Sequence, residues 1–216
     1  MTGLIGNRLA ELADTDPRAF DDTLTLDDPE TLGYLVLGPI ILDYLAWARR
    51  VAVAESKDKI LFLSREGYLL QQAYETMRGA SGAHSPQGVY LLASRRGIGT
   101  SSIREIEDID YLLDSTYTGT LYALLDARAG RRIANAARQV LGDALASKEV
   151  YLPEMRTALV EALRPLAGRI LEIAECERNA YLNYWNNQIG DSSVLLSDIG
   201  YAGTIQKHLS RLLSQN

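Results

Sequence analysis

The chain has 216 residues, of which 47% are apolar and 23% charged, a composition typical of one globular domain or of one domain with a large insertion. Its net charge of −6 argues against a nucleic-acid partner, because proteins that wrap a phosphate backbone carry a basic face. The single cysteine excludes an internal disulfide framework, and we expect no secretory signal, so the sequence predicts a cytoplasmic protein.

The N-terminal part of the chain is predicted to be a peripheral arm followed by a buried helix. Residues 1–30 are polar and rich in aspartate, with little apolar periodicity. Residues 33–54 then predict a largely buried helix, bent or begun at Pro39. Its most apolar stretch, residues 34–47, is short for a bilayer span and contains Asp43. We therefore expect no integral membrane segment.

Three apolar runs of strand length predict a sheet, at residues 59–64, 89–93 and 194–197. Helical patterns follow the first and the third run, and strands that alternate with helices favour a parallel, wound α/β sheet. Residues 103–188 have a helical pattern throughout and are far too long for an ordinary crossover. The sequence therefore predicts one domain, residues 31–216, with a helical insertion at 103–188.

The third run leads into a turn that is suited to a phosphate. Residues 197–204 carry Gly200 and Gly203 and run directly into a helix. Such a turn aims several backbone N–H groups at one point, and the helix dipole adds positive potential there. Thr204 can donate a hydrogen bond to the ligand or cap the helix. A simple strand–helix turn with a capping threonine would show the same pattern.

The first two runs end in arginine and glycine. The first continues as Ser64-Arg65-Glu66-Gly67, and the second as Ser94-Arg95-Arg96-Gly97 before a predicted Gly/Ser loop. Guanidinium groups and exposed amides at these positions suit a second anion. A surface ion pair of Arg65, or two solvated arginines after the second strand, would explain the same residues. In a parallel sheet the three strand ends share one edge, where ligands bind.

These motifs resemble those of type I phosphoribosyltransferases, which use phosphoribosyl pyrophosphate (PRPP). Residues 196–204 resemble the PRPP loop, with Asp198 at its second acid and Gly203 at its glycine. Residues 62–68 look like the pyrophosphate loop. Residues 90–96 are similar to the strand that carries basic residues into the flexible catalytic loop.

A closer resemblance, from Leu32 onward, is to a bacterial family often fused to haloacid-dehalogenase-type phosphatases or to glycosyltransferases. It implies a transferase that moves ribofuranosyl 5-phosphate from PRPP to a glycan acceptor, in O-antigen or capsule synthesis, with inversion of the anomer. A separate phosphatase partner would then remove the 5-phosphate. The sequence departs from the usual pattern at Ser197, where an acid is expected, and at Ala202, where threonine is usual.

The resemblance also implies a role for each strand-end residue. Asp198 would hold the ribose hydroxyls together with a magnesium ion, and Glu66 is the candidate general base, with Asp108 and Asp110 as alternatives. An ion pair with an arginine would equally account for Glu66. The 5-phosphate would be bound by Gly200, Tyr201, Ala202, Gly203 and Thr204. The pyrophosphate would be bound by Ser64, Arg65, Gly67, Ser94, Arg95 and Arg96.

Two other classes of function compete with this interpretation. A haloacid-dehalogenase-type phosphatase needs an Asp-x-Asp sequence after an apolar strand, and no such strand is predicted before Asp14 or Asp108. A non-catalytic module that binds a phosphate ligand would have lost a carboxylate, as Ser197 suggests. Tyr181 and Tyr184 could stack on a sugar acceptor or simply pack at a helix end.

Overall fold

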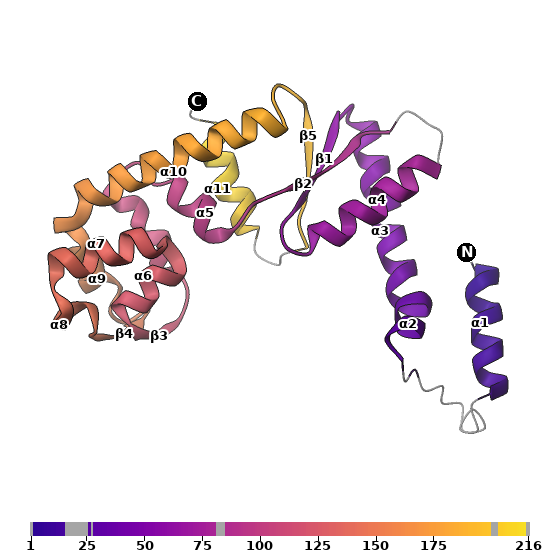
Figure 1. The fold of residues 1–216 in the computed structure, drawn as a ribbon, viewed down its shortest axis with the longest axis horizontal. Coiled ribbons are helices and arrows are strands. Elements are labelled where there is room, and N and C mark those ends of the chain that lie inside the picture. Colours follow the sequence, from indigo (N-terminus) through magenta and orange to yellow (C-terminus); the bar gives the residue numbers. More distant parts are fainter. Residues whose placement is uncertain (1, 16–25, 27, 81–84, 200–202, 215–216) are drawn as a thin grey trace. The chain divides into compact units, whose positions relative to one another are not determined.

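The computed structural model describes residues 2–15, 26, 28–80, 85–199 and 203–214, and Figure 1 shows their fold. The chain divides into two compact units. The first, here called the strand unit, comprises Met1–Leu91 and Ser193–Ser197. The second, the helical unit, comprises Leu92–Ser192 and Asp198–Asn216.

The strand unit contains a parallel sheet of three strands in the order β2-β1-β5, which confirms the predicted α/β class with a parallel sheet. In the register of the sheet, Lys59 of β1 lies opposite Gln87 of β2 and Val194 of β5. The strands are β1 (Lys59–Leu63), β2 (Gln87–Leu91) and β5 (Val194–Ser197), and the helices are α1 (Thr2–Thr15), α2 (Pro29–Leu32), the π-helix η2 (Gly33–Leu37), α3 (Gly38–Ala54) and α4 (Gly67–Ala80).

Two helices cover one face of this sheet. Side chains alternate between the faces of a strand, so Ile60 and Phe62 of β1 point the same way. They form one apolar cluster with Leu45 of α3 and with Leu70 and Tyr74 of α4. Leu61 and Leu63 of β1 point to the opposite face and are buried as well, a pattern typical of a parallel strand.

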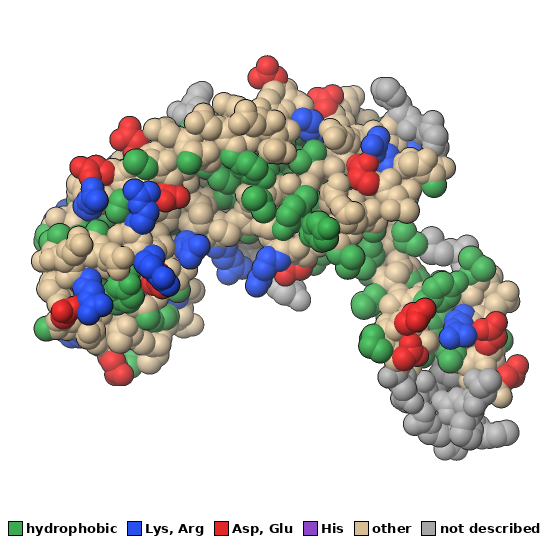
Figure 2. Space-filling view, in the orientation of Figure 1, with side chains coloured by type: hydrophobic (Ala, Val, Ile, Leu, Met, Phe, Trp, Pro, Cys, Tyr) green, Lys and Arg blue, Asp and Glu red, His purple; other side chains and the backbone are tan. Residues whose placement is uncertain are grey.

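The prediction of a largely buried helix over residues 33–54 is wrong. Only Leu35, Leu45, Ala48 and Ala52 are buried in this segment, because a single face of α3 packs on the sheet. Figure 2 shows hydrophobic side chains on the surface of the α2–α3 segment. The large exposed ones between residues 32 and 53 are Leu32, Tyr34, Val36, Leu37, Ile40, Trp47 and Val53.

Among the residues described, one helical run is long and apolar enough to cross a membrane by length and composition. It is Pro29–Ala54, with a mean hydropathy of 1.4. Core helices of other proteins pass the same test, so this finding does not decide how the segment is used.

Part of the predicted N-terminal arm is helical. Residues 2–15 form α1, and the carboxylate of Asp28 caps α2 by accepting a hydrogen bond from the Thr31 N–H at 2.7 Å. Hydrogen bonds from the Thr31 side chain and from its backbone N–H lower the pKa of Asp28.

The helical unit has its own apolar core. The sequence predicts helices throughout residues 103–188, and the structure corrects this prediction. The unit contains an antiparallel pair, β3 (Tyr117–Thr120) with β4 (Glu149–Leu152). Both strands have four residues, too few for a period of two to stand out in the sequence. The helices are α5 (Arg95–Ser101), the 3₁₀ helix η3 (Ile106–Leu113), α6 (Leu121–Ala129), α7 (Arg131–Leu141), α8 (Asp143–Ala146), α9 (Arg156–Leu163), the 3₁₀ helix η4 (Arg164–Leu166), α10 (Ala167–Gln188) and α11 (Thr204–Leu213).

Candidate functional site

The carboxyl ends of β1, β2 and β5 lie at one edge of the parallel sheet, as predicted. The candidate ligand-binding residues follow these ends along the chain, and the residues directly after β2 and β5 belong to the helical unit. Gly200, Tyr201 and Ala202 lie outside the described residues.

After β1 the chain turns tightly into α4. The N–H of Ser64 still donates to the Leu91 carbonyl of β2 at 3.0 Å, and the N–H of Tyr68 donates to the Arg65 carbonyl at 3.2 Å. Gly67 is buried, and a Cβ atom added there would lie 2.6 Å from the backbone carbon of Phe62. Helix α4 therefore begins so close to β1 that only glycine fits, which gives Gly67 a structural role.

The side chain of Glu66 stays near its own backbone. Its Oε2 atom accepts a hydrogen bond from the N–H of Arg65 at 3.3 Å. Hydrogen bonds from the backbone N–H groups of Glu66 and Arg65 lower the pKa of this carboxyl. The carboxylate is exposed, and the salt bridges between described residues include none that joins it to Arg65. Glu66 is thus ionised at neutral pH but a weak base.

The predicted Gly/Ser loop after β2 is instead helix α5, so that prediction is wrong. Ser94 is its N-cap and accepts a hydrogen bond from the Gly97 N–H at 3.0 Å. Gly99 is buried, and a Cβ atom there would lie 2.5 Å from the Tyr111 hydroxyl oxygen. The small residues of this stretch therefore allow close packing of a helix, a role that composition alone does not distinguish from loop flexibility.

Two tyrosines of α10 hold the segment that precedes α5. The backbone N–H of Leu92 donates to the Tyr184 hydroxyl at 2.9 Å, and the Tyr181 hydroxyl donates to the Leu92 carbonyl at 3.3 Å. The two rings meet edge to face, with centroids 5.8 Å apart. These contacts favour the packing interpretation of the tyrosine pair over sugar stacking.

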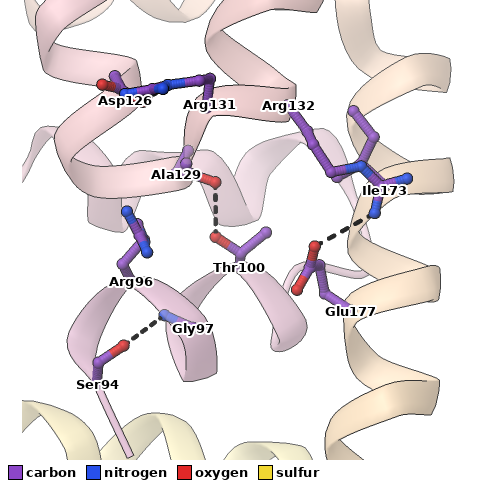
Figure 3. A pocket seen from close by; sticks show the side chains of 11 residues that line it. Ser94, Arg96, Gly97, Thr100, Asp126, Ala129, Arg131, Arg132, Ile173 and Glu177 are labelled. Atoms are coloured by element: carbon purple, nitrogen blue, oxygen red, sulfur yellow. Dashed lines mark hydrogen bonds and ion pairs between the residues drawn. The ribbon is translucent and has the colours of Figure 1, made fainter.

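Arg95 and Arg96 are both exposed at the start of α5. Arg96 lines an open cavity of about 430 Å³ whose lining residues come from α5, α6, α7 and α10, from Ser94 before α5 and from Gly130 between α6 and α7, all in the helical unit. Figure 3 shows this cavity, with Ser94, Arg96 and Thr100 on the α5 side. The Cδ atom of Arg96 lies 3.8 Å from the Cβ position of Gly130, at the junction of α6 and α7.

After β5 the two adjacent residues differ in their surroundings. Ser197 is buried, and its Oγ lies 2.9 Å from the Tyr44 hydroxyl oxygen of α3. Asp198 is partly exposed. Gly203 is the N-cap of α11 with φ 57° and ψ 19°, in the left-handed region that favours glycine, and none of the side chains that the structure describes caps this helix. Thr204 is therefore the first residue of α11 and not its cap.

The alternative general bases have structural roles within the helical unit. Asp108 is buried and accepts hydrogen bonds from the N–H of Arg104 at 2.7 Å and from the Arg211 guanidinium. Asp110 pairs with Arg156, whose Nε donates to it at 2.8 Å. Both lie on the 3₁₀ helix η3, so this Asp-x-Asp sequence does not follow a strand, and Asp14 lies in α1.

Sequence reasoning missed four charged residues of the cavity. They are Asp126 at the end of α6, Arg131 and Arg132 at the start of α7, and Glu177 of α10. The only signal in the sequence is the two adjacent arginines, Arg131 and Arg132, that follow Gly130. In the part of the chain that the structure describes, no cluster of three His, Cys, Asp or Glu side chains forms a ready metal site.

The comparisons with known proteins give no independent family assignment. No protein-family model matches the chain, and no curated protein matches it.

Proposed function

We propose that this protein transfers the 5-phosphoribosyl group of PRPP to a hydroxyl of a glycan acceptor, in the cytoplasm, with release of pyrophosphate. The observation that carries the proposal is the start of α11. Gly203, in the left-handed conformation, is the N-cap of this helix six residues after β5 ends, and no side chain among the described residues caps its first turn. The first N–H groups of such a helix have no partner within the helix and, with its dipole, suit a phosphate.

In this proposal the chain's own residues bind and orient PRPP. The segment from Gly200 to Thr204 holds the 5-phosphate, and Asp198 accepts hydrogen bonds from the ribose hydroxyls. Arg65 and Arg95 contact the pyrophosphate. Their electrostatic interaction with this leaving group strengthens as negative charge develops on it in the transition state. The bond between C1 and the pyrophosphate oxygen breaks with both electrons going to the oxygen.

A magnesium ion fits this donor set. Magnesium is commonly held by one or two carboxylates together with substrate phosphate oxygens, so Asp198 and the pyrophosphate would suffice. When bound, it would neutralise charge on the leaving group.

The acceptor oxygen then bonds to C1 on the opposite face and loses its proton. Glu66 remains our candidate for the group that accepts this proton. Its lowered pKa makes it a weak base. A weak base suits a reaction in which the leaving group departs first, because bonding to a cationic C1 makes the acceptor O–H strongly acidic.

The test is to mix the protein with PRPP, Mg²⁺ and a panel of glycan acceptors and to follow the phosphorus NMR spectrum. Appearance of pyrophosphate that depends on the acceptor is the expected result. If PRPP binds but no acceptor releases pyrophosphate, the protein is a non-catalytic binding module. Absence of PRPP binding would rule out both the transferase and the non-catalytic binding module.

A further inference from the structure

The cavity between α5, α6, α7 and α10 is large enough for a ligand of its own. Its volume of about 430 Å³ falls in the range of about 300–1,000 Å³ that small-molecule sites occupy. All its lining residues belong to the helical unit, and none of them is aromatic. The cavity therefore offers no stacking surface for a base.

The charges of the lining leave one positive charge without a partner. Arg131 pairs with Asp126 at 3.6 Å, and Arg132 pairs with Glu177 at 3.3 Å. No ion pair or hydrogen bond of the Arg96 side chain is recorded with any residue that the structure describes. Three arginines against two carboxylates give a net charge of +1, which favours an anionic ligand.

The paired groups can still bind a ligand. The side chains of Arg131 and Arg132 are 77% and 61% exposed, and ion pairs between exposed groups are weak enough to rearrange. Figure 3 shows the Arg132–Glu177 pair and the Thr100 hydroxyl, which donates to the Ala129 carbonyl at 3.2 Å, around the same cavity.

The remaining lining groups match a sugar. The carboxylates of Asp126 and Glu177 can accept hydrogen bonds from sugar hydroxyls, and the Ser94 hydroxyl can donate one. Ile173 and Ala129, which are almost completely buried, are the apolar members of the lining. Hydroxyl partners beside one unpaired guanidinium are the recognition pattern for a sugar with a single acidic group.

We propose that this cavity binds an acidic sugar, with Arg96 pairing to its carboxylate or phosphate. That this sugar is part of the glycan acceptor rests on the proposed function. Binding of the acidic sugar itself does not.

The experiment measures dissociation constants by calorimetry for three probes, glucuronate, glucose 1-phosphate and glucose. Glucuronate or glucose 1-phosphate should bind at least tenfold more tightly than glucose, and the tighter of the two identifies the acidic group. Arg96→Gln should raise the dissociation constant of the acidic probe at least tenfold. The control variant Arg169→Gln removes an exposed arginine of α10 that pairs with Glu172 and should leave every constant unchanged.

Several outcomes would overturn the proposal. They are equal affinity for glucose and the acidic probes, no effect of Arg96→Gln, or no binding at all. Competition with PRPP separates this proposal from the proposed function. If PRPP displaces the acidic sugar, the cavity is a donor site and the acceptor assignment fails. If the acidic sugar binds while PRPP does not bind anywhere, the proposed function fails and the acidic-sugar site stands.

Discussion

The hydroxyl oxygens of Ser197 and Tyr44 lie 2.9 Å apart and join the last residue of β5 to helix α3. In the resemblance to type I phosphoribosyltransferases, Ser197 would stand where the first of two acids is usual, and it is buried at 4% exposure. A carboxylate at this place would be removed from water and would face a phenol. The carboxylate that follows β5 is that of Asp198, which is partly exposed.

Replacing this serine with an acid should destabilise the protein rather than restore an acidic pair. Ser197→Asp buries a charge without a cationic partner, which costs several kcal/mol, whereas Ser197→Ala loses one hydrogen bond worth about 0.5–1.5 kcal/mol. Urea unfolding of the two variants and the parent protein measures both losses. A Ser197→Asp variant as stable as Ser197→Ala would contradict the buried environment.

Gly203 should be required for PRPP binding but not for folding. Among the residues that the structure describes, a Cβ atom there would contact only the Gln206 Oε1, at 3.9 Å, but φ 57° costs most L residues about 1–2 kcal/mol. Gly203→Val should therefore shift the backbone and abolish PRPP binding in calorimetry while the protein stays folded. Gly203→Asn, which tolerates this conformation, should retain binding. Equal PRPP affinity in the valine variant would refute the phosphate-loop assignment.

Replacing Arg95 should lower the rate of pyrophosphate release more than it weakens the binding of ribose 5-phosphate. Its guanidinium is exposed at the start of α5 and is assigned to the leaving pyrophosphate. Arg95→Ala should raise the barrier by about 2–4 kcal/mol, about 30- to 1,000-fold in rate, with little effect on ribose 5-phosphate binding. Steady-state pyrophosphate release measures the rate, with Arg50→Ala of α3 as a control. A change of less than tenfold would show that Arg95 belongs to a solvated surface.

Asp108 should stabilise the helical unit in a pH-dependent way. Burial raises the pKa of Asp108, but hydrogen bonds from the Arg104 N–H and the Arg211 guanidinium outweigh it and hold the pKa below 3.8. Because the pKa is lower in the folded state, the stabilisation is present above pH 3.8 and disappears as the pH falls through the folded value.

Asp108→Asn should therefore lower the free energy of unfolding by about 1.5–3 kcal/mol at pH 7 and by much less near pH 3. Urea unfolding across this range provides the measurement. Asp110→Asn removes a more exposed pair and should cost less than about 1 kcal/mol. A loss at Asp108 that does not vary with pH would contradict the assigned ion pair.

The immediate product should keep its 5-phosphate. The proposed loop holds this phosphate throughout the reaction as a handle that orients C1. The Asp-x-Asp sequence at Asp108 lies on a 3₁₀ helix. Asp108 accepts a hydrogen bond from the Arg104 N–H and Asp110 pairs with Arg156, so neither carboxylate is placed as a phosphatase nucleophile. Mass spectrometry of the glycan should show a phosphoribosyl addition that a separate phosphatase converts to ribose. A bare ribose product from purified protein would refute this division of labour.

The sequence predicted the sheet well because buried parallel strands are continuous apolar runs. β1 and β5 were located to within a residue or two, and the helix that follows Gly203 was found from its pattern. Helix α3 was predicted to be buried because its composition is apolar on several faces. Composition does not reveal which faces of a helix have a partner.

The candidate site was predictable only where the chemistry is local. The N-cap of α11 involves one glycine and the residues beside it, whereas the cavity at Arg96 is lined by residues that lie between positions 94 and 177 of the sequence. The Gly97–Ser102 stretch was predicted to be a loop because glycine and serine favour loops on average. In the structure most of it forms a helix whose close packing against Tyr111 requires small residues.

The pairing of β5 with β1 also constrains how the protein folds during synthesis. Ser193 donates a hydrogen bond to Asp58 at 2.8 Å across 135 residues of sequence, and Leu195 packs against the cluster of Ile60 and Phe62. On the ribosome, β1 and β2 emerge long before their third strand exists, because residues 92–192 of the helical unit are synthesised before β5. Until β5 arrives, the inner strand β1 is an open edge able to pair with another chain. The hydrogen bonds between Asp58 and Ser193 thus close the sheet last.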